Sequence, residues 1–142
     1  MRKHQKQLTV GLWIIAIVAV LATVSSSIHE YTDDFNNVYQ SLRNFVTGEN
    51  VYWEDYYGNN DPHYLYSPAA TVILSPFALI GHYGMAHVVF SGINAACVVG
   101  AVILMFKYLG MRLDDWKLPT ALLMMFVTAN VQLSVAWGVN SC

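Results

Sequence analysis

The chain has 142 residues, of which 56% are hydrophobic and only 11% are charged, and its formal net charge is -2. Soluble domains carry about 25% charged residues, so this composition, together with a mean hydropathy of +0.41, predicts a membrane protein. The slightly acidic balance excludes the basic field that nucleic-acid-binding proteins need. The two cysteines, Cys97 and Cys142, have no spacing that is typical of a metal or redox site.

Residues 9–28 form the first apolar segment, which contains no charge and follows a short basic start at residues 2–6. A helix of this length crosses about 30 Å of hydrocarbon, the thickness of a bilayer core. A cleaved signal peptide is the alternative, because small residues at 22–27 lie where a cleavage site would be. We interpret the segment as an uncleaved span, since it is longer than a signal core of about 7–15 residues and more apolar segments follow.

An amphipathic helix is predicted directly after this segment. Apolar residues recur there at helical spacing, which places them on one face: Phe35, Val38, Tyr39, Leu42, Phe45 and Val46. Thr32 or Asp33 can cap the start of this helix, and Gly48 is placed where a helix ends. The helix dipole favours ionised carboxylates in a first turn, so Asp34 at a membrane surface could act as a general base. The alternative is that Asp33 and Asp34 only cap a surface helix.

An acidic and aromatic region continues to residue 84. Six of its aromatic residues either form an interfacial belt at the membrane or line a wall for a sugar or lipid headgroup: Tyr52, Trp53, Tyr56, Tyr57, Tyr64 and Tyr66. Residues 69–80 are apolar but too short to span a bilayer, and Pro76 interrupts them, so we expect a short broken or re-entrant helix. His82 and His87 are interpreted as interfacial residues, because no carboxylate lies at metal-site spacing from them.

Two further apolar segments, 85–106 and 118–137, are separated by a charged turn at 107–117. Three of the seven cations precede the first span and three lie in this turn, which leaves only Arg43 between the spans. The positive-inside rule therefore places the N-terminus and the turn in the cytoplasm and the loop 29–84 outside. The sequence predicts an all-α membrane protein with about three transmembrane helices, a juxtamembrane amphipathic helix and a short broken or re-entrant helix in the first outer loop.

Several short elements follow one another in this outer region. They are Asp34-Phe35 with Val38-Tyr39, Gly48 to Tyr52, Tyr64-Leu65-Tyr66-Ser67-Pro68 and Leu74-Ser75-Pro76, with Asn94 in the next helix. In order and spacing they resemble glycosyltransferase family 87, polytopic GT-C transferases that include polyprenol-phosphate-mannose-dependent mannosyltransferases. The chain departs from the family pattern at Val51 and Ser67, where prolines are common, and Trp137 to Asn140 match a Gly-Gln-x-Asn element only loosely.

The resemblance implies an integral membrane hexosyltransferase, with mannose as the expected sugar. The donor would be a polyprenyl-phosphate-linked sugar. A hydroxyl of a lipid or glycan acceptor would attack its anomeric carbon with inversion, at the outer face of the plasma (inner) membrane. Asp34 matches the acidic residue that removes the acceptor proton, and Asp33 is the fallback. The residues expected to bind substrate, with Arg43 as the local cation for the leaving phosphate, are Tyr39, Arg43, Tyr52, Tyr64 and Tyr66. No cofactor and no metal ligand are expected.

Enzymes of this family need a bundle of many more spans. We therefore expect the chain to be an N-terminal fragment that inserts into membranes but transfers no sugar by itself. The competing hypothesis is a small non-enzymatic three-span protein that acts as an assembly or interaction partner. A channel or transporter is disfavoured, because no predicted span carries an ionisable residue in its middle.

Overall fold

The computed structural model describes residues 2–26, 34–52, 67–128 and 131. All regular structure within these ranges is helical and none is strand, which confirms the all-α prediction. In chain order the helices are α1 (Arg2–Ser26), α2 (Asp34–Thr47), α3 (Pro68–Leu74), the 3₁₀ helix η2 (Ser75–Leu79), α4 (Tyr83–Tyr108) and α5 (Lys117–Val127).

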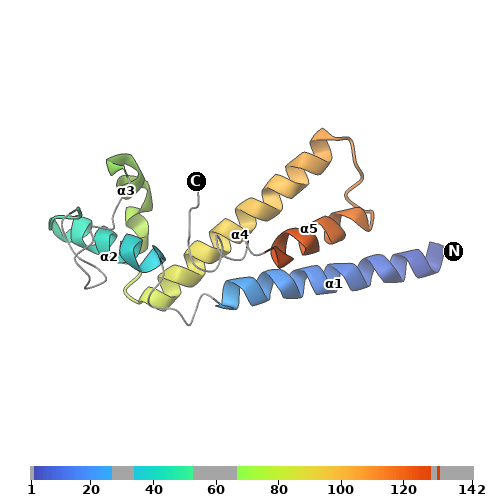
Figure 1. The fold of residues 1–142 in the computed structure, drawn as a ribbon, viewed down its shortest axis with the longest axis horizontal. Helices are drawn as coiled ribbons and strands as arrows, with labels where there is room; N and C mark the ends of the chain where they lie inside the picture. Colours follow the sequence, from blue (N-terminus) through green and yellow to red (C-terminus); the bar gives the residue numbers. More distant parts are fainter. Residues whose placement is uncertain (1, 27–33, 53–66, 129–130, 132–142) are drawn as a thin grey trace.

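The helices form two groups that share α4 (Figure 1). α1, α4 and α5 pack together around a core of small and large apolar residues: Ala16, Val102, Phe106, Leu118 and Leu122. α2, α3 and η2 gather at the N-terminal end of α4, and we call this group, with the first turns of α4, the α2 lobe. The N-terminus of α1 and the turn between α4 and α5 lie together at the opposite end of the molecule.

Two helices, α1 from His4 to Ser26 and α4, are long and apolar enough to cross a bilayer. Only 11% of the most apolar window of α1 and 22% of that of α4 are buried, whereas the core helix of a soluble protein would be mostly buried. Large apolar side chains are exposed along both helices, among them Ile14, Val18, Leu21, Ile93 and Leu104. Extended apolar surface of this kind marks a membrane contact, so the two helices support an integral membrane protein.

The third predicted span, 118–137, is covered only in part. α5 runs from Lys117 to Val127, and most of the predicted span beyond it lies outside the described residues. The described part buries Leu118, Leu122 and Phe126 against α1 and α4. The count of three spans therefore stays a prediction.

The amphipathic helix predicted after the first apolar segment is present as α2. Four residues of its apolar face are buried against η2 and the first turns of α4: Phe35, Val38, Tyr39 and Leu42. The periodicity also places Phe45 and Val46 on this face, but they are 41% and 51% exposed. Periodicity identifies a face, whereas burial depends on the partner surface, and the cluster packed against α2 extends along it only as far as Leu42.

α2 ends at the glycine that the sequence indicates. Gly48 has φ of 80°, in the left-handed region that glycine adopts without steric cost. Its N–H donates to the carbonyl oxygen of Phe45 at 3.3 Å, and the N–H of Glu49 donates to that of Asn44 at 2.8 Å. These two bonds form a Schellman motif, which satisfies the last carbonyl groups of the helix.

Pro76 breaks the short apolar helix, as predicted. The Ser67 side chain caps α3 by accepting a hydrogen bond from the N–H of Ala70 at 3.3 Å. Pro76 has no N–H to donate and its ring obstructs an α-helical path, so the chain continues as η2 and leaves helical geometry at Ile80. α3 and η2 together fall short of a membrane span, and they form one side of the α2 lobe.

We expect Leu42→Ala to weaken the packing of α2 far more than Phe45→Ala. Leu42 is fully buried, and removing a buried leucine side chain costs about 2–5 kcal/mol, whereas Phe45 is already partly exposed. Hydrogen exchange of the protein in lipid nanodiscs measures the difference. The α2 amides should exchange at least about 30-fold faster in Leu42→Ala, and equal protection in the two variants would contradict the observed packing.

Candidate functional site

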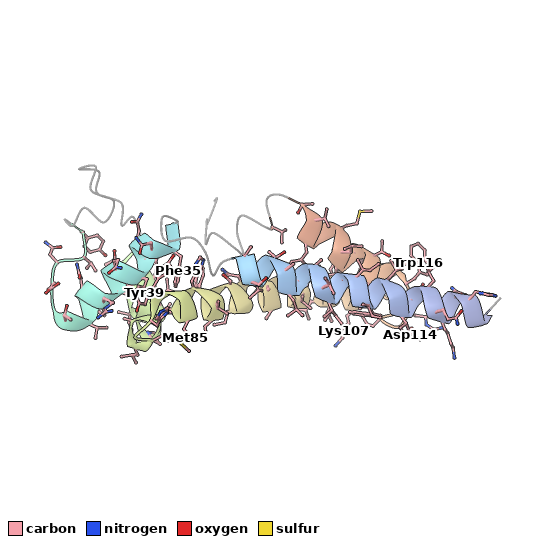
Figure 2. All side chains as sticks on the ribbon, turned by 90° about the horizontal axis from the view of Figure 1, so that it is seen from below. Phe35, Tyr39, Met85, Lys107, Asp114 and Trp116 are labelled. Atoms are coloured by element: carbon pink, nitrogen blue, oxygen red, sulfur yellow. The ribbon has the colours of Figure 1, made fainter. Side chains whose placement is uncertain are left out.

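The candidate site begins where the first turn of α2 meets the start of α4. Phe35, the residue after Asp34, is fully buried, and its ring stacks on His87 at a centroid distance of 4.9 Å and on Phe90 at 4.6 Å. Figure 2 shows Phe35 and Tyr39 of α2 beside the first turns of α4, near Met85. The packing of Phe35 therefore fixes the backbone of Asp34, the first residue of α2, at this junction.

Tyr39 fastens the same helix to the turn that precedes α4. Its hydroxyl donates a hydrogen bond of 2.7 Å to the carbonyl oxygen of Ile80, and its ring meets Tyr83 edge-on at 5.6 Å. The carbonyl is available because Ile80, the residue after η2, is in an extended conformation. Tyr39 is buried, so the structure gives this predicted substrate-binding residue an internal contact, and its contact with substrate stays a prediction.

His87 was missed as a member of this site. The sequence places it at the membrane interface, but the structure buries it completely between aromatic rings. Its Nδ1 lies 3.4 Å from the hydroxyl oxygen of Tyr83, one turn earlier in α4. The sequence gives no indication of this burial, because Phe35, which packs on His87, lies far away in the sequence. The interfacial position of His87 stays a prediction. His82 is exposed, as an interfacial residue would be.

α2 has a second buried face, which is polar. Asn37 and Ser41 are 6% and 0% exposed. The Oδ1 atom of Asn37 and the Oγ atom of Ser41 have no hydrogen-bond partner in the described part of the chain. Asp34, Asn37 and Ser41 follow one another at intervals of three and four residues, which places them on one side of the helix. The spacing of these three residues on one side of the helix can be read from the sequence. The sequence does not indicate that Asn37 and Ser41 are buried.

Of the other predicted substrate-binding residues, the structure describes Arg43 and Tyr52, and neither lies at this junction. Arg43 is exposed on α2, and its separation from Asp34 places it on the opposite side of the helix, since each residue turns the chain by about 100°. Tyr52 is 38% exposed, beyond the end of the helix. The remaining candidates, Asp33, Tyr64 and Tyr66, lie outside the described residues.

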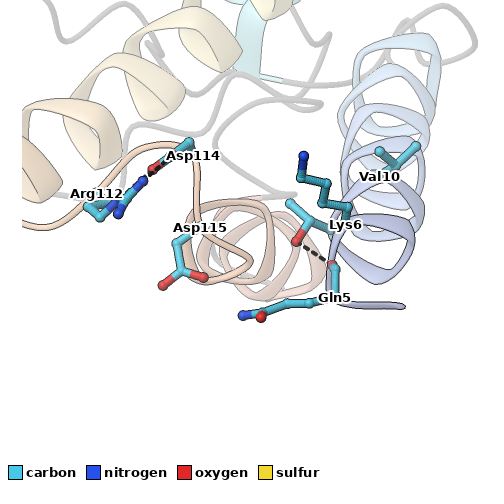
Figure 3. Close-up of a pocket in the computed structure, with 7 residues that line it drawn as sticks. Gln5, Lys6, Val10, Arg112, Asp114 and Asp115 are labelled. Carbon is cyan, nitrogen blue, oxygen red and sulfur yellow. Dashed lines mark hydrogen bonds and ion pairs between the residues drawn. The ribbon is translucent and has the colours of Figure 1, made fainter. Parts of the chain in front are cut away.

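A cavity of about 640 Å³ lies at the other end of the molecule, between the start of α1 and the turn that precedes α5 (Figure 3). Its lining is Gln5, Lys6, Thr9, Val10, Arg112, Asp114 and Asp115. The Nε and Nη2 atoms of Arg112 donate to the carboxylate of Asp114 at 3.0 and 2.6 Å. This hydrogen bonding lowers the pKa of Asp114 and raises that of Arg112. Both side chains of the pair are exposed, so the cavity is a solvated feature, remote from α2.

Residues 64–142 match the family model described as glycosyltransferase family 87. No solved structure shows significant similarity to the chain.

The curated relatives include three proteins named alpha-(1->3)-arabinofuranosyltransferase. The one from Corynebacterium glutamicum is 41% identical over 101 residues, which cover 71% of this chain and 24% of the relative. Those from Mycobacterium tuberculosis and Mycolicibacterium smegmatis are 30% and 31% identical over 135 and 134 residues, which cover 93% and 92% of this chain and 31% of each relative. The chain thus spans about a quarter to a third of the length of these relatives.

We expect Tyr39→Phe to loosen the attachment of α2 to the turn before α4. The substitution keeps the ring but removes the donor to the Ile80 carbonyl, and the loss of such a bond costs about 0.5–1.5 kcal/mol. In hydrogen exchange, the amides of α2 should open about 2- to 10-fold more often. Tyr108→Phe is the matched control because Tyr108 is 90% exposed, and an equal effect of both substitutions would show that the Tyr39 bond adds nothing.

Proposed function

Because the chain belongs to glycosyltransferase family 87, we propose that it serves the transfer of an arabinofuranosyl group from a polyprenyl-phosphate donor to a glycan or lipid acceptor in the membrane. The names of the relatives support this choice of sugar. They give no support to mannose, the sugar expected from the resemblance to mannosyltransferases. A furanosyl pentose therefore replaces the hexose in the proposal.

The proposed reaction is a displacement at the anomeric carbon of the donor sugar. An acceptor hydroxyl forms the new C–O bond while the bond from the anomeric carbon to the phosphate oxygen breaks, and the polyprenyl phosphate leaves with the bonding electron pair. The hydroxyl proton passes to a carboxylate that acts as general base. With inversion, an α(1→3) product, the linkage named for the relatives, requires a β-linked donor.

We propose Asp34 as the general base, with Asp33 as the fallback. The observation that carries this assignment is the position of Asp34 as the first residue of α2, where the positive end of the helix dipole favours an ionised carboxylate. Phe35 packs against His87 and Phe90, so the turn that carries Asp34 is held on the protein. A base held in this way keeps a constant distance to a bound acceptor, which proton transfer requires.

The other binding roles follow from position. Arg43 lies on the opposite side of α2 from Asp34, so we propose that its guanidinium binds a lipid phosphate group at the membrane surface. Tyr52, Tyr64 and Tyr66 remain proposed contacts for sugar rings or headgroups, since aromatic side chains offer both an apolar face and a hydroxyl. Tyr39 contributes by holding α2 in place through Ile80.

The proposed location is the cytoplasmic membrane, with the α2 lobe on the outer face. The first turns of α1 and the turn between α4 and α5 line one cavity, so the two cation-rich segments lie at the same end of the molecule. Six of the seven cations belong to these segments or flank them. The positive-inside rule assigns that end to the cytoplasm, and it leaves the α2 lobe with Arg43 as its cation.

We expect Asp34→Asn to lower sugar transfer by about 10²–10⁴-fold, the usual contribution of a general base. Transfer is measured with membranes that contain the protein expressed from its complete reading frame, a polyprenyl-phosphate-linked arabinofuranose and an arabinan acceptor. Donor binding should survive, since the amide keeps the shape of the side chain. Asp33→Asn should cost much less, through a weakened helix cap of about 1 kcal/mol.

The two variants are compared at matched protein abundance in the membrane. If Asp33→Asn is inactive and Asp34→Asn is not, the base is Asp33. If both transfer sugar at the native rate, the pair is only a helix cap. If the unmodified protein transfers mannose and not arabinofuranose, the choice of sugar is wrong while the assignment of the base can still be tested.

We expect Glu49→Cys to react with a membrane-impermeant thiol reagent in intact cells, and Gln5→Cys to react only after the cells are opened. Both positions are exposed, one just after α2 and one in the first turns of α1. The background carries replacements of Cys97 and Cys142. The reverse pattern would overturn the proposed orientation.

A further inference from the structure

Ser41 of α2 and Ser91 of α4 are fully buried serines that lack the hydrogen bond that most other hydroxyl groups of the described helices make. Serine and threonine side chains there commonly donate to a carbonyl three or four residues earlier, as Thr9, Thr23 and Ser26 do. This local bond is the default for a hydroxyl in a helix. Ser41 is fully buried in α2 and does not make it, and its Oγ has no other partner in the described part of the chain.

Asn37 lies one turn before Ser41 and also has a buried polar atom without a hydrogen-bond partner in the described part of the chain. Asn37 is only 6% exposed, and its Oδ1 atom accepts no hydrogen bond from the described residues. Buried polar atoms in native proteins are nearly always paired, because an unpaired one has lost its water without compensation. Two such atoms on neighbouring turns of one helix point to a partner outside the described residues, and a bound molecule could supply it.

The register of α2 relates these two atoms to the proposed base. Asp34, Asn37 and Ser41 share one side of the helix and extend over about 10 Å of its axis, at 1.5 Å for each residue. The apolar residues that hold α2 to the protein lie on a different side. Arg43, the cation proposed for lipid phosphate, lies opposite, so the Asp34 side of α2 is uncharged beyond its first residue.

We infer that Asn37 and Ser41 bind hydroxyl groups of the acceptor sugar, next to the hydroxyl that attacks the donor. This inference rests on the proposed function, because the base must contact the acceptor, and groups on the side of the base are the nearest to it. A sugar ring carries several hydroxyls, each a donor and an acceptor. One can donate to Oδ1 of Asn37 while another bonds to Oγ of Ser41. Both atoms are closed to solvent in this structure. Binding of the acceptor therefore requires the residues packed around them to move apart.

The chemistry of Asn37 and Ser41 suits the acceptor better than the donor. A donor site must neutralise a phosphate, for which positively charged side chains are needed, whereas Asn37 and Ser41 supply neutral hydrogen-bonding atoms suited to hydroxyls. A site that bonds a substrate hydroxyl rejects an analogue that lacks it, because its own polar atom is then left unpaired. Asn37 and Ser41 are therefore specificity-determining residues for the acceptor.

The test uses Ser41→Ala and Asn37→Ala in the protein expressed from its complete reading frame. Each substitution should raise KM for the acceptor about 3- to 10-fold, the loss expected for one hydrogen bond, and leave KM for the donor unchanged. The temperature of unfolding should stay the same or rise, because each variant removes a buried polar atom that has no partner. Ser25→Ala is the matched control, since the Ser25 hydroxyl is exposed and donates to the carbonyl of Ala22.

Acceptor analogues that each lack one hydroxyl give a second readout. For the hydroxyl that contacts Ser41, the native enzyme should lose affinity while Ser41→Ala binds the analogue and the intact acceptor equally well. A general structural effect of Ser41→Ala would not depend on a particular hydroxyl. Equal losses for every analogue in both enzymes would overturn the inference.

Other outcomes separate this inference from the function on which it rests. If the native protein transfers arabinofuranose and both variants keep its kinetic constants, the subsite is overturned and the proposed function stands. A rise in KM for the donor alone would overturn the assignment to the acceptor. A lower unfolding temperature would show that the two atoms have internal partners, which also overturns it. If the native protein transfers no arabinofuranose, the proposed function fails and this inference fails with it.

Discussion

The contact on which the rest of the α2 lobe depends is the packing of the Phe35 ring against His87 and Phe90. It joins the first turn of a polar helix to the first turns of an apolar helix that is long enough to span the membrane. Aromatic pairs at these distances add about 0.5–1.5 kcal/mol beyond the burial of their area, and Phe77 and Tyr83 extend the same cluster. Because Phe35 directly follows Asp34, a hydrophobic contact holds the turn that carries the proposed base.

The break at Pro76 makes this arrangement possible. A continuous helix from Pro68 into α4 would carry the chain away from α2, and its carbonyl groups would all be used within the helix. The proline ends the α-helical pattern, η2 stops at Leu79, and the carbonyl of Ile80 becomes available to the Tyr39 hydroxyl. Because Pro76 lacks an N–H, the helix ends early and the following turn brings α4 against α2. The carbonyl of Ile80 in this turn then accepts the hydrogen bond that holds α2 there.

The sequence predicts the features of this fold that have local causes. The start of α2 near Asp34, its end at Gly48 and the break at Pro76 each follow from the conformational limits of one or two residues. Features that depend on distant partners could not be predicted. Phe45 and Val46 share the apolar face of α2 but stay partly exposed, His87 is buried beside Phe35 from a distant part of the chain, and periodicity does not indicate the burial of Asn37 and Ser41. The candidate site was therefore predicted at Asp34, from its place at a helix start, and missed at the polar residues beside it.

The exposed end of α2 has a physical explanation in the proposed orientation. The first two turns bury their apolar side against protein, so the apolar residues left over, Phe45 and Val46, are at the last turn. At a membrane surface such residues are stable in the interfacial region, where Arg43 can also keep its charge in water. α2 would then contact lipid at its C-terminal end and protein at its N-terminal end. This division keeps the turn that carries Asp34 away from the lipid tails, where a carboxylate would be costly, and beside the buried polar atoms of Asn37 and Ser41, where an acceptor hydroxyl could be held.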